Sequence, residues 1–253
     1  NFMELETLGL RNDLYKILEK EIQRPNGMII VTGPTGAGKT TTLYAFLMKI
    51  KTSEIKIITI EDPIEYHLKG VEQTQAEPEK GYGFSEGLKS IVRQDPDVIL
   101  VGEVRDSETA KIALQASLTG HLVLTTLHTN DASGTIPRLV DLGASPTSIA
   151  PALKMVVAQR LVRTVCKKCS VLAKPSAEEL TEIKHGLKNV PKQITGIKDF
   201  SKIKIANASQ KGCHECNFVG YKGRKGLFEV FLVGKEMEKF ILTNPPVSAI
   251  REM

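Results

Sequence analysis

The sequence has no tryptophan, and aromatic residues make up only 5% of its 253 residues. Proteins that bind single-stranded nucleic acid stack bases on aromatic side chains along a basic groove. Neither an aromatic-rich strand nor a concentrated basic stripe occurs here, and the residues behind the net charge of +5 are spread along the chain. That spread is typical of a solvated surface, so nucleic acid is disfavoured as a partner.

Long hydrophobic runs are also missing, since the longest are strand-sized stretches such as "MIIV" and "VILV". A membrane helix needs about 18 or more consecutive apolar residues, so nothing here is predicted to span a bilayer. No signal peptide follows Asn1, and the chain stops within the helix-like "PPVSAIREM". We therefore expect both ends to continue in a longer protein.

Cysteine is scarce but arranged in a pattern. The four cysteines form two C-x-x-C pairs, Cys166 with Cys169 and Cys213 with Cys216. This spacing is typical of a metal site, and the basic stretches "RLVRTVCKK" and "YKGRK" lie beside the two pairs.

Apolar strand patterns alternate with helical patterns in the first 143 residues. The predicted strands are 27–33, 56–62, 97–102 and 121–128, and the predicted helices are 39–50, 85–95, 106–120 and 131–143. Such alternation predicts an α/β fold with a parallel central sheet, whose ligand site lies at the carboxyl ends of the strands.

The pattern changes beyond about residue 145. We predict a helix over 148–162, and a short helix near 177–188 because Ser176 and Glu179 have the spacing of a capping box. The predicted domains are an upstream remnant and linker (1–26), the α/β core (27–160), a tetracysteine subdomain (161–230) and a truncated C-terminal helical segment (231–253).

The stretch "GPTGAGKT" fits G-x-x-x-x-G-K-[ST] at every fixed position. Its glycines let backbone N–H groups point inward, and the following helix adds its positive end, which makes a cradle for phosphate oxygens. Lys39 supplies positive charge to the β- and γ-phosphates, and the Thr40 hydroxyl is a Mg²⁺ ligand. The predicted nucleotide-binding residues are Gly33, Pro34, Thr35, Gly36, Ala37, Gly38, Lys39, Thr40 and Thr41.

Hydrolysis also needs a carboxylate and a held metal, and three strand ends offer candidates. Glu61, Asp62 and Glu65 follow the second strand, although an acidic surface turn is an equally open interpretation. Glu103 follows a strand too apolar to end on an unpartnered charge. His121 and His128 bracket the fourth strand, about 23 Å apart if it is extended, and His128 at its carboxyl end is the better functional candidate.

Four stretches, "GPTGAGKT", "TIEDPIEY", "RQDPDVILVGEVRD" and "TGHLVLTTLHTND", have the order and spacing of the ATPases that drive type II secretion and type IV pili. The chain resembles that family from about residue 10 to its end. The resemblance implies a RecA-like P-loop core in a hexameric motor on the cytoplasmic face of the inner membrane.

The resemblance also implies residue roles. Lys39 and Thr40 match the Walker A lysine and hydroxyl, and Glu65 matches the glutamate that acts as general base on water. Glu103 matches the atypical Walker B glutamate that coordinates Mg²⁺, while His121 and His128 match two histidines that couple nucleotide state to subunit arrangement. The family supplies arginines from an upstream domain; Arg93 and Arg105 are candidates here, with surface or ion-pair roles equally open.

In a cytosolic protein of this kind, four thiolates around Zn²⁺ are favoured over free thiols or disulfides, and His214 is interpreted as a spectator. Four protein ligands leave no open position, so the zinc is structural. The two cysteine pairs resemble those of the assembly and secretion members of the family. Retraction motors of the same family lack such pairs.

The sequence therefore predicts a Mg²⁺-dependent ATPase of a pilus assembly or type II secretion motor. The resemblance implies a homo-hexamer, an inner-membrane platform protein as partner, and a cytoplasmic adaptor bound through an upstream domain. The alternatives are a RecA-like nucleic-acid translocase and a non-catalytic, zinc-containing nucleotide scaffold. A GTP switch is disfavoured because no N-K-x-D motif is present.

Overall fold

The computed structural model describes residues 4–253, which divide into two compact units. The larger unit runs to Leu161 and resumes at Gly226, and the smaller unit is Val162–Lys225. Two long strands, β6 (Leu153–Val165) and β9 (Tyr221–Leu232), contain the boundaries between them. Each unit is described separately below.

A seven-stranded sheet in the order β3-β2-β4-β5-β1-β6-β9 forms the centre of the larger unit. All strand pairs from β3 across to β6 are parallel. The remaining strands are β1 (Gly27–Thr32), β2 (Ile57–Glu61), β3 (Glu72–Gln75), β4 (Val98–Val101) and β5 (Leu122–Leu127).

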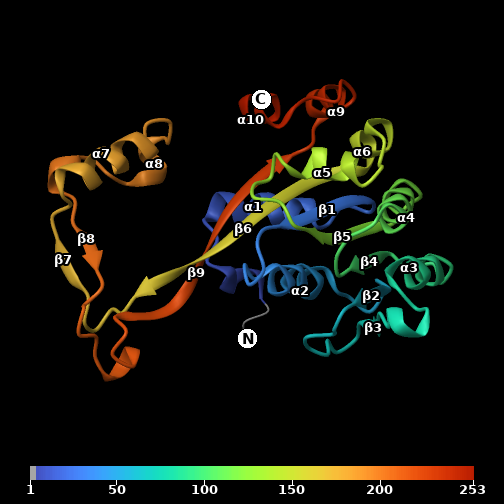
Figure 1. The fold of residues 1–253 in the computed structure, drawn as a ribbon, viewed down its shortest axis with the longest axis horizontal. Helices are drawn as coiled ribbons and strands as arrows, with labels where there is room; N and C mark the ends of the chain where they lie inside the picture. The colour runs from blue at the N-terminus through green and yellow to red at the C-terminus, as the bar shows by residue number, and fades with distance from the viewer. Residues whose placement is uncertain (1–3) are drawn as a thin grey trace. The chain divides into compact units, whose positions relative to one another are not determined.

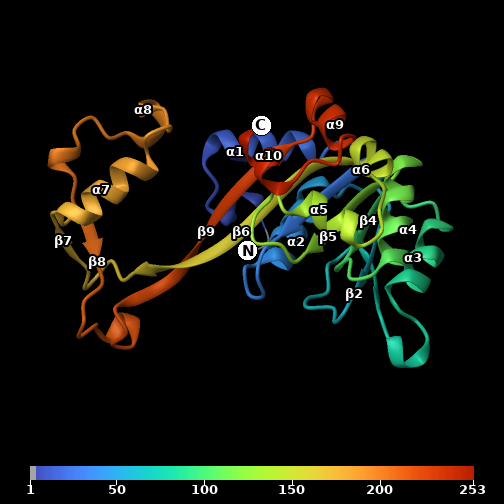
Figure 2. The ribbon, with the colours of Figure 1, turned by 45° about the horizontal axis from the view of Figure 1, so that its top comes forward.

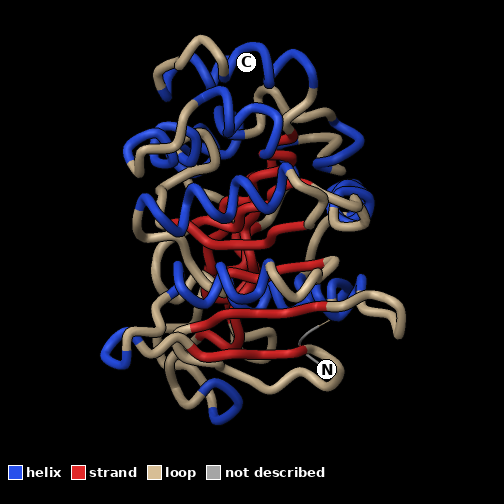
Figure 3. Tube along the Cα trace, turned by 90° about the vertical axis from the view of Figure 1, so that its right-hand side faces the viewer, coloured by secondary structure: helices blue, strands red, loops and turns tan. Residues whose placement is uncertain are grey.

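Helices cover both faces of this sheet (Figures 1 and 3). Alternate residues of β1 point to opposite faces, so Ile29 and Val31 pack with α1 and α2, while Met28 and Ile30 pack in the core that also contains residues of α3 to α6. The helices are α1 (Asn12–Glu21), α2 (Lys39–Ile50), α3 (Phe84–Val92), α4 (Ser107–Leu118), α5 (Thr135–Asp141), α6 (Pro146–Ala152), α9 (Lys235–Ile241) and α10 (Val247–Glu252), with 3-10 turns at Leu5–Leu8 and Pro78–Lys80.

The central strands form because their sequences are apolar at consecutive positions. Every residue of β1, β2, β4 and β5 is buried, as a parallel strand covered on both faces requires. The four strands and four helices predicted for this region are confirmed, with boundaries shifted by a few residues. Their parallel pairing brings the carboxyl ends of these strands to one edge of the sheet.

The helix predicted over 148–162 is wrong. Helix α6 ends at Ala152, and the chain continues as strand β6, which pairs in parallel with β1. Met155, Val156 and Val157 are fully buried there, so this apolar run serves a strand covered on both faces. In Figures 1 and 2, α6 and α9 lie side by side over this part of the sheet, and α3 lies beside α4.

The smaller unit holds a two-stranded antiparallel sheet and short helices. The predicted capping box is confirmed: the backbone N–H of Glu179 donates to Ser176 Oγ at 3.1 Å, and the N–H of Ser176 donates to Glu179 Oε2 at 2.7 Å. Its elements are β7 (Val171–Ala173), α7 (Ala177–Gly186), α8 (Lys192–Thr195), β8 (Ile205–Asn207) and 3-10 turns at Phe200–Lys202 and His214–Cys216.

Across residues 4–253, no helix combines the length and apolar character that crossing a bilayer requires.

Candidate nucleotide site and cysteine cluster

The phosphate-loop motif lies between β1 and α2, at the carboxyl edge of the sheet. Gly33 has φ of 144°, and a Cβ there would lie 2.3 Å from the Gln159 carbonyl oxygen of β6, so only glycine fits. Gly38, with φ of 86°, caps the amino end of α2. The loop is therefore held against β6 at one end and opens onto a helix N-terminus at the other, which suits an anion.

Lys39 folds back over the loop that precedes it. Its Nζ donates to the carbonyl oxygens of Gly33 at 3.0 Å and Pro34 at 3.2 Å. Burial lowers the pKa of Lys39, and the nearby charge of Glu103 opposes this shift. Lys39 and Glu103, which are 64 positions apart in the chain, thus belong to one electrostatic cluster.

Glu103 follows β4 and is largely buried, with its side chain 12% exposed. Its carboxylate forms an ion pair with Arg105, and its Oε2 lies 3.6 Å from His128 Nε2. The structure therefore brings Lys39, Glu103 and His128 together. Arg105 takes the ion-pair role in this structure, whereas Arg93 is exposed just after α3.

The carboxylate of Glu103 and the hydroxyl of Thr40, the residue after Lys39 in the first turn of α2, are oxygen donors of the kind Mg²⁺ prefers. The donor set around the phosphate loop therefore suits this ion.

His121 lies at the opposite end of β5 from His128. It is buried, and its Nδ1 lies 3.0 Å from the carbonyl oxygen of Ala116 in α4. Its backbone carbonyl also accepts from Gly27 N at the start of β1. The structure does not bring His121 to the phosphate loop, so its role in subunit arrangement stays a prediction.

The acidic stretch after β2 divides into a buried and an exposed part. Glu61 is the last residue of β2 and is 3% exposed, whereas Asp62 and Glu65 are exposed. Among residues 4–253, the Glu65 side chain has no hydrogen-bond or ion-pair partner, so its carboxylate faces solvent.

A threonine pair was not predicted from the sequence. Thr32, the residue before the phosphate loop, accepts from the backbone N–H of Thr129 at 2.9 Å, and the two hydroxyl oxygens are 2.7 Å apart. This pair ties the segment that follows His128 to the start of the phosphate loop. The link joins positions 97 residues apart, and no local sequence pattern predicts it.

The four cysteine side chains gather in the smaller unit. All four Sγ atoms lie within 4.8 Å of one another, and three pairs are 3.8 Å apart: Cys166 with Cys213, Cys169 with Cys216, and Cys213 with Cys216. Four sulfurs at about 2.3 Å from a tetrahedral metal ion would be about 3.8 Å apart. The cluster thus has the dimensions of a four-thiolate metal site.

Backbone groups prepare this cluster for a cation. Burial acts to raise the pKa of Cys216, but hydrogen bonds from the N–H groups of Cys213 and Gly220, together with the neighbouring Cys169 and Cys213 side chains, lower the pKa to about 6. Burial raises the pKa of Cys169 in contrast. A metal ion requires thiolates, so N–H donors aimed at a sulfur favour binding.

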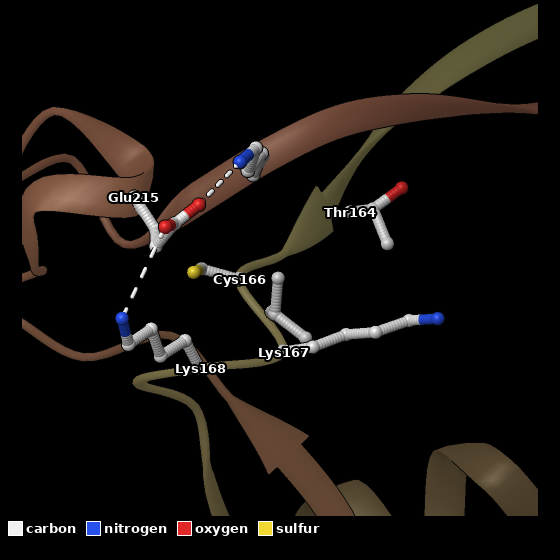
Figure 4. Close-up of a pocket in the computed structure, with 7 residues that line it drawn as sticks. Thr164, Cys166, Lys167, Lys168 and Glu215 are labelled. Atoms are coloured by element: carbon white, nitrogen blue, oxygen red, sulfur yellow. Dashed lines mark hydrogen bonds and ion pairs between the residues drawn. The ribbon is translucent and has the colours of Figure 1, made fainter.

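A pocket of about 310 Å³ lies beside the cysteines (Figure 4). Glu215 is its acidic residue, and it pairs with Lys222 at 2.7 Å and with Lys168 at 3.9 Å. These pairs offset part of the positive charge around Cys166 and Cys169.

Comparison with known proteins identifies the family. The model of the type II/IV secretion system protein family matches residues 1–253. The chain is 45% identical over 251 residues to type II secretion system protein E of Pectobacterium carotovorum subsp. carotovorum, covering 99% of this chain and 47% of that protein. It is 42% identical over 250 residues to the type IV pilus assembly ATPase PilB of Thermus thermophilus, covering 99% of this chain and 27% of that protein.

The chain belongs to the type II/IV secretion system protein family. It spans less than half the length of these curated relatives. Among solved structures, the pilus retraction motor PilT with bound ADP is similar, with a TM-score of 0.67, 30% identity, and coverage of 98% of this chain and 58% of that one. The predicted RecA-like α/β core is confirmed.

Proposed function

We propose that this chain is the ATP-hydrolysing domain of a hexameric motor that assembles a type IV pilus or a type II secretion pseudopilus. The observation that carries the proposal is the convergence of Lys39, Glu103 and His128 at the phosphate loop of a family member. Its curated relatives named above belong to these two machines.

In this proposal the phosphate loop binds ATP and each residue has one task. Backbone N–H groups of residues 33–40 and Lys39 hold the phosphate oxygens. Glu65 accepts a proton from the attacking water, a task that suits an exposed carboxylate that no side chain of residues 4–253 pairs with. Mg²⁺, when bound, neutralises charge on the β- and γ-phosphates, and Thr40 and Glu103 would hold it.

The proposed partners follow from family membership and the resemblance described above. They are five further copies of the chain, an inner-membrane platform protein and a cytoplasmic adaptor bound through an upstream domain. The proposed location is the cytoplasm, against the inner face of the cell membrane.

We also propose that the cysteine cluster binds one structural Zn²⁺. The 3.8 Å spacing of the sulfurs supports a tetrahedral ion, and an all-thiolate set is typical of zinc.

The decisive experiment distinguishes the proposed role of Glu65 in water activation from that of Glu103 in Mg²⁺ binding. Glu65→Gln should lower ATP turnover by about 10²- to 10⁴-fold, the usual contribution of a general base, and leave Mg·ATP binding unchanged. Glu103→Gln should weaken nucleotide binding in the presence of Mg²⁺ and leave Mg²⁺-free binding intact. Single-turnover hydrolysis and nucleotide titration, each with and without Mg²⁺, measure both effects.

Glu72→Gln is the matched control, because Glu72 is an exposed glutamate at the edge strand β3. It should change neither quantity. Unchanged turnover in Glu65→Gln would remove Glu65 as the base, and nucleotide binding without any hydrolysis by the native chain would favour a non-catalytic scaffold.

A further inference from the structure

Glu61 has no catalytic task in the proposal above, yet its carboxyl group is surrounded by donors. Tyr44 donates its hydroxyl proton to Oε2, while Thr59 Oγ1 and Gln73 Nε2 donate to Oε1 at 2.5 and 3.0 Å. No lysine or arginine pairs with Glu61 among residues 4–253. A buried carboxyl group is tolerated only when it is hydrogen-bonded, so these three neutral side chains keep Glu61 in place.

Gln73 also holds the loop that carries Glu65. Its Oε1 accepts from the backbone N–H of Leu68 at 2.6 Å, and its Nε2 donates to the carbonyl oxygen of Tyr66 at 3.1 Å. One side chain on β3 thus joins Glu61 to two backbone positions of the loop 62–68. The loop is therefore held by side-chain hydrogen bonds as well as by its covalent connection to β2.

Tyr44 makes the second link. Burial and the acceptor Glu61 raise the pKa of Tyr44, and the nearby backbone N–H groups of Tyr66 and Glu65 oppose that rise. The Tyr44 hydroxyl therefore donates to Glu61 and lies close to the loop backbone at Glu65 and Tyr66. Tyr44 lies in α2, the helix that begins at Lys39, so a single rigid element carries both the phosphate-loop lysine and this contact.

We propose that Tyr44 and Gln73 are positioning residues, which anchor the loop 62–68 on the buried Glu61 carboxyl group and so fix Glu65 relative to the phosphate loop. The inference rests on the proposed function, in which Glu65 activates water. Displacement of a catalytic group by about 1 Å can slow a reaction by about 10²-fold, so the anchor is expected to act on the rate.

The test compares variants that each remove one donor from Glu61. Gln73→Leu removes the amide group that also bonds Tyr66 and Leu68, and Tyr44→Phe removes the hydroxyl that lies beside the loop backbone. Thr59→Val is the matched control, because Thr59 is fully buried and bonds the same carboxyl group, but its side chain forms no hydrogen bond to the loop among residues 4–253. All three should lower thermal stability, because each leaves the buried carboxyl group with one donor fewer.

Single-turnover hydrolysis at saturating Mg·ATP should separate them. Tyr44→Phe and Gln73→Leu should lower the rate about 10- to 100-fold with an unchanged nucleotide Kd, and Thr59→Val should retain the native rate. Equal rate losses in all three would make the cluster merely structural and overturn the inference. So would native rates in Tyr44→Phe and Gln73→Leu beside an inactive Glu65→Gln variant.

Hydrogen exchange gives a readout that is independent of catalysis. The amides of Glu65 and Tyr66 should exchange faster in Tyr44→Phe than in the native chain, and at the native rate in Thr59→Val. Unaltered exchange in Tyr44→Phe would overturn the anchor itself. Faster exchange together with full activity of Glu65→Gln would instead keep the anchor and reject Glu65 as the base.

Discussion

The protonation of His128, whose side chain is 52% exposed, is set by four charged neighbours and by partial desolvation of its ring. Burial and the positive charge of Lys39 lower its pKa, Glu103 acts in the opposite direction, and Arg105 and Arg138 add to the lowering. A histidine with a pKa below its usual value of about 6.5 is neutral at neutral pH. Neutral His128 can therefore accept or donate one hydrogen bond without adding charge to the site.

The charged neighbours of His128 predict the direction in which its pKa shifts when each is replaced. Glu103→Gln removes the charge that raises the pKa and should lower it further, whereas Lys39→Ala should raise it toward 6.5. NMR titration of the His128 ring in the native chain and both variants measures these shifts.

The stability contribution of His128 has the corresponding sign. Its folded-state pKa is below the unfolded value, so its contribution is complete above about pH 6.5 and declines as the pH falls below that value. His128→Asn should reduce the loss of stability in this acidic range. A native pKa above 6.5 would show that Glu103 outweighs burial and Lys39, and would contradict the predicted sign.

At the scale of elements, the strands of the central sheet were predictable because each is a short apolar run closed by a turn. Strand β6 was not, because a run buried on both faces has no period that distinguishes it from a buried helix. The prediction took "SIAPALKMVVAQRLV" as one helix, while pairing with β1 converts its second half to strand. Only a contact between residues 126 positions apart, Ile29 and Met155, decides the matter.

The residues of the site also divide into those that the sequence could predict and those that it could not. The residues of the phosphate loop, Glu103 and His128 each follow a strand of the parallel sheet. Because the carboxyl ends of these strands meet at one edge, their proximity could be predicted from the sequence. Tyr44 and Gln73 carry no motif, and their relation to Glu61 depends on how α2 and β3 pack against β2.

Helix α7 allows a prediction for a single element. Ser176→Ala removes the hydroxyl that accepts from the N–H of Glu179, and loss of such a cap typically costs about 1 kcal/mol. Amide exchange within Ala177–Gly186 should become several-fold faster. Thr181→Ala is the control, because its hydroxyl donates to the carbonyl of Ala177 and caps no N–H group; equal effects of the two changes would show that the cap is unimportant.

At the scale of the whole molecule, the two units are stabilised by different means. The larger unit has two extensive apolar cores, one on each face of its sheet. In Val162–Lys225, among the residues whose burial is described, only Cys166, Cys216 and Gly220 are buried. A unit without an apolar core depends on a crosslink or a metal for its stability, so the cysteine cluster is its centre.

Removal of the proposed zinc ion should therefore unfold one unit and spare the other. Binding free energy at a structural zinc site is folding free energy, so Cys213→Ser or chelation should bring amides across Val162–Lys225 to fast exchange while the phosphate loop keeps its nucleotide affinity. His214→Ala is the matched control, since His214 lies between two of the cysteines but packs on Phe218. It should retain one zinc ion per chain and native exchange. Slow exchange in a metal-free smaller unit would show that its fold does not depend on the cysteine cluster.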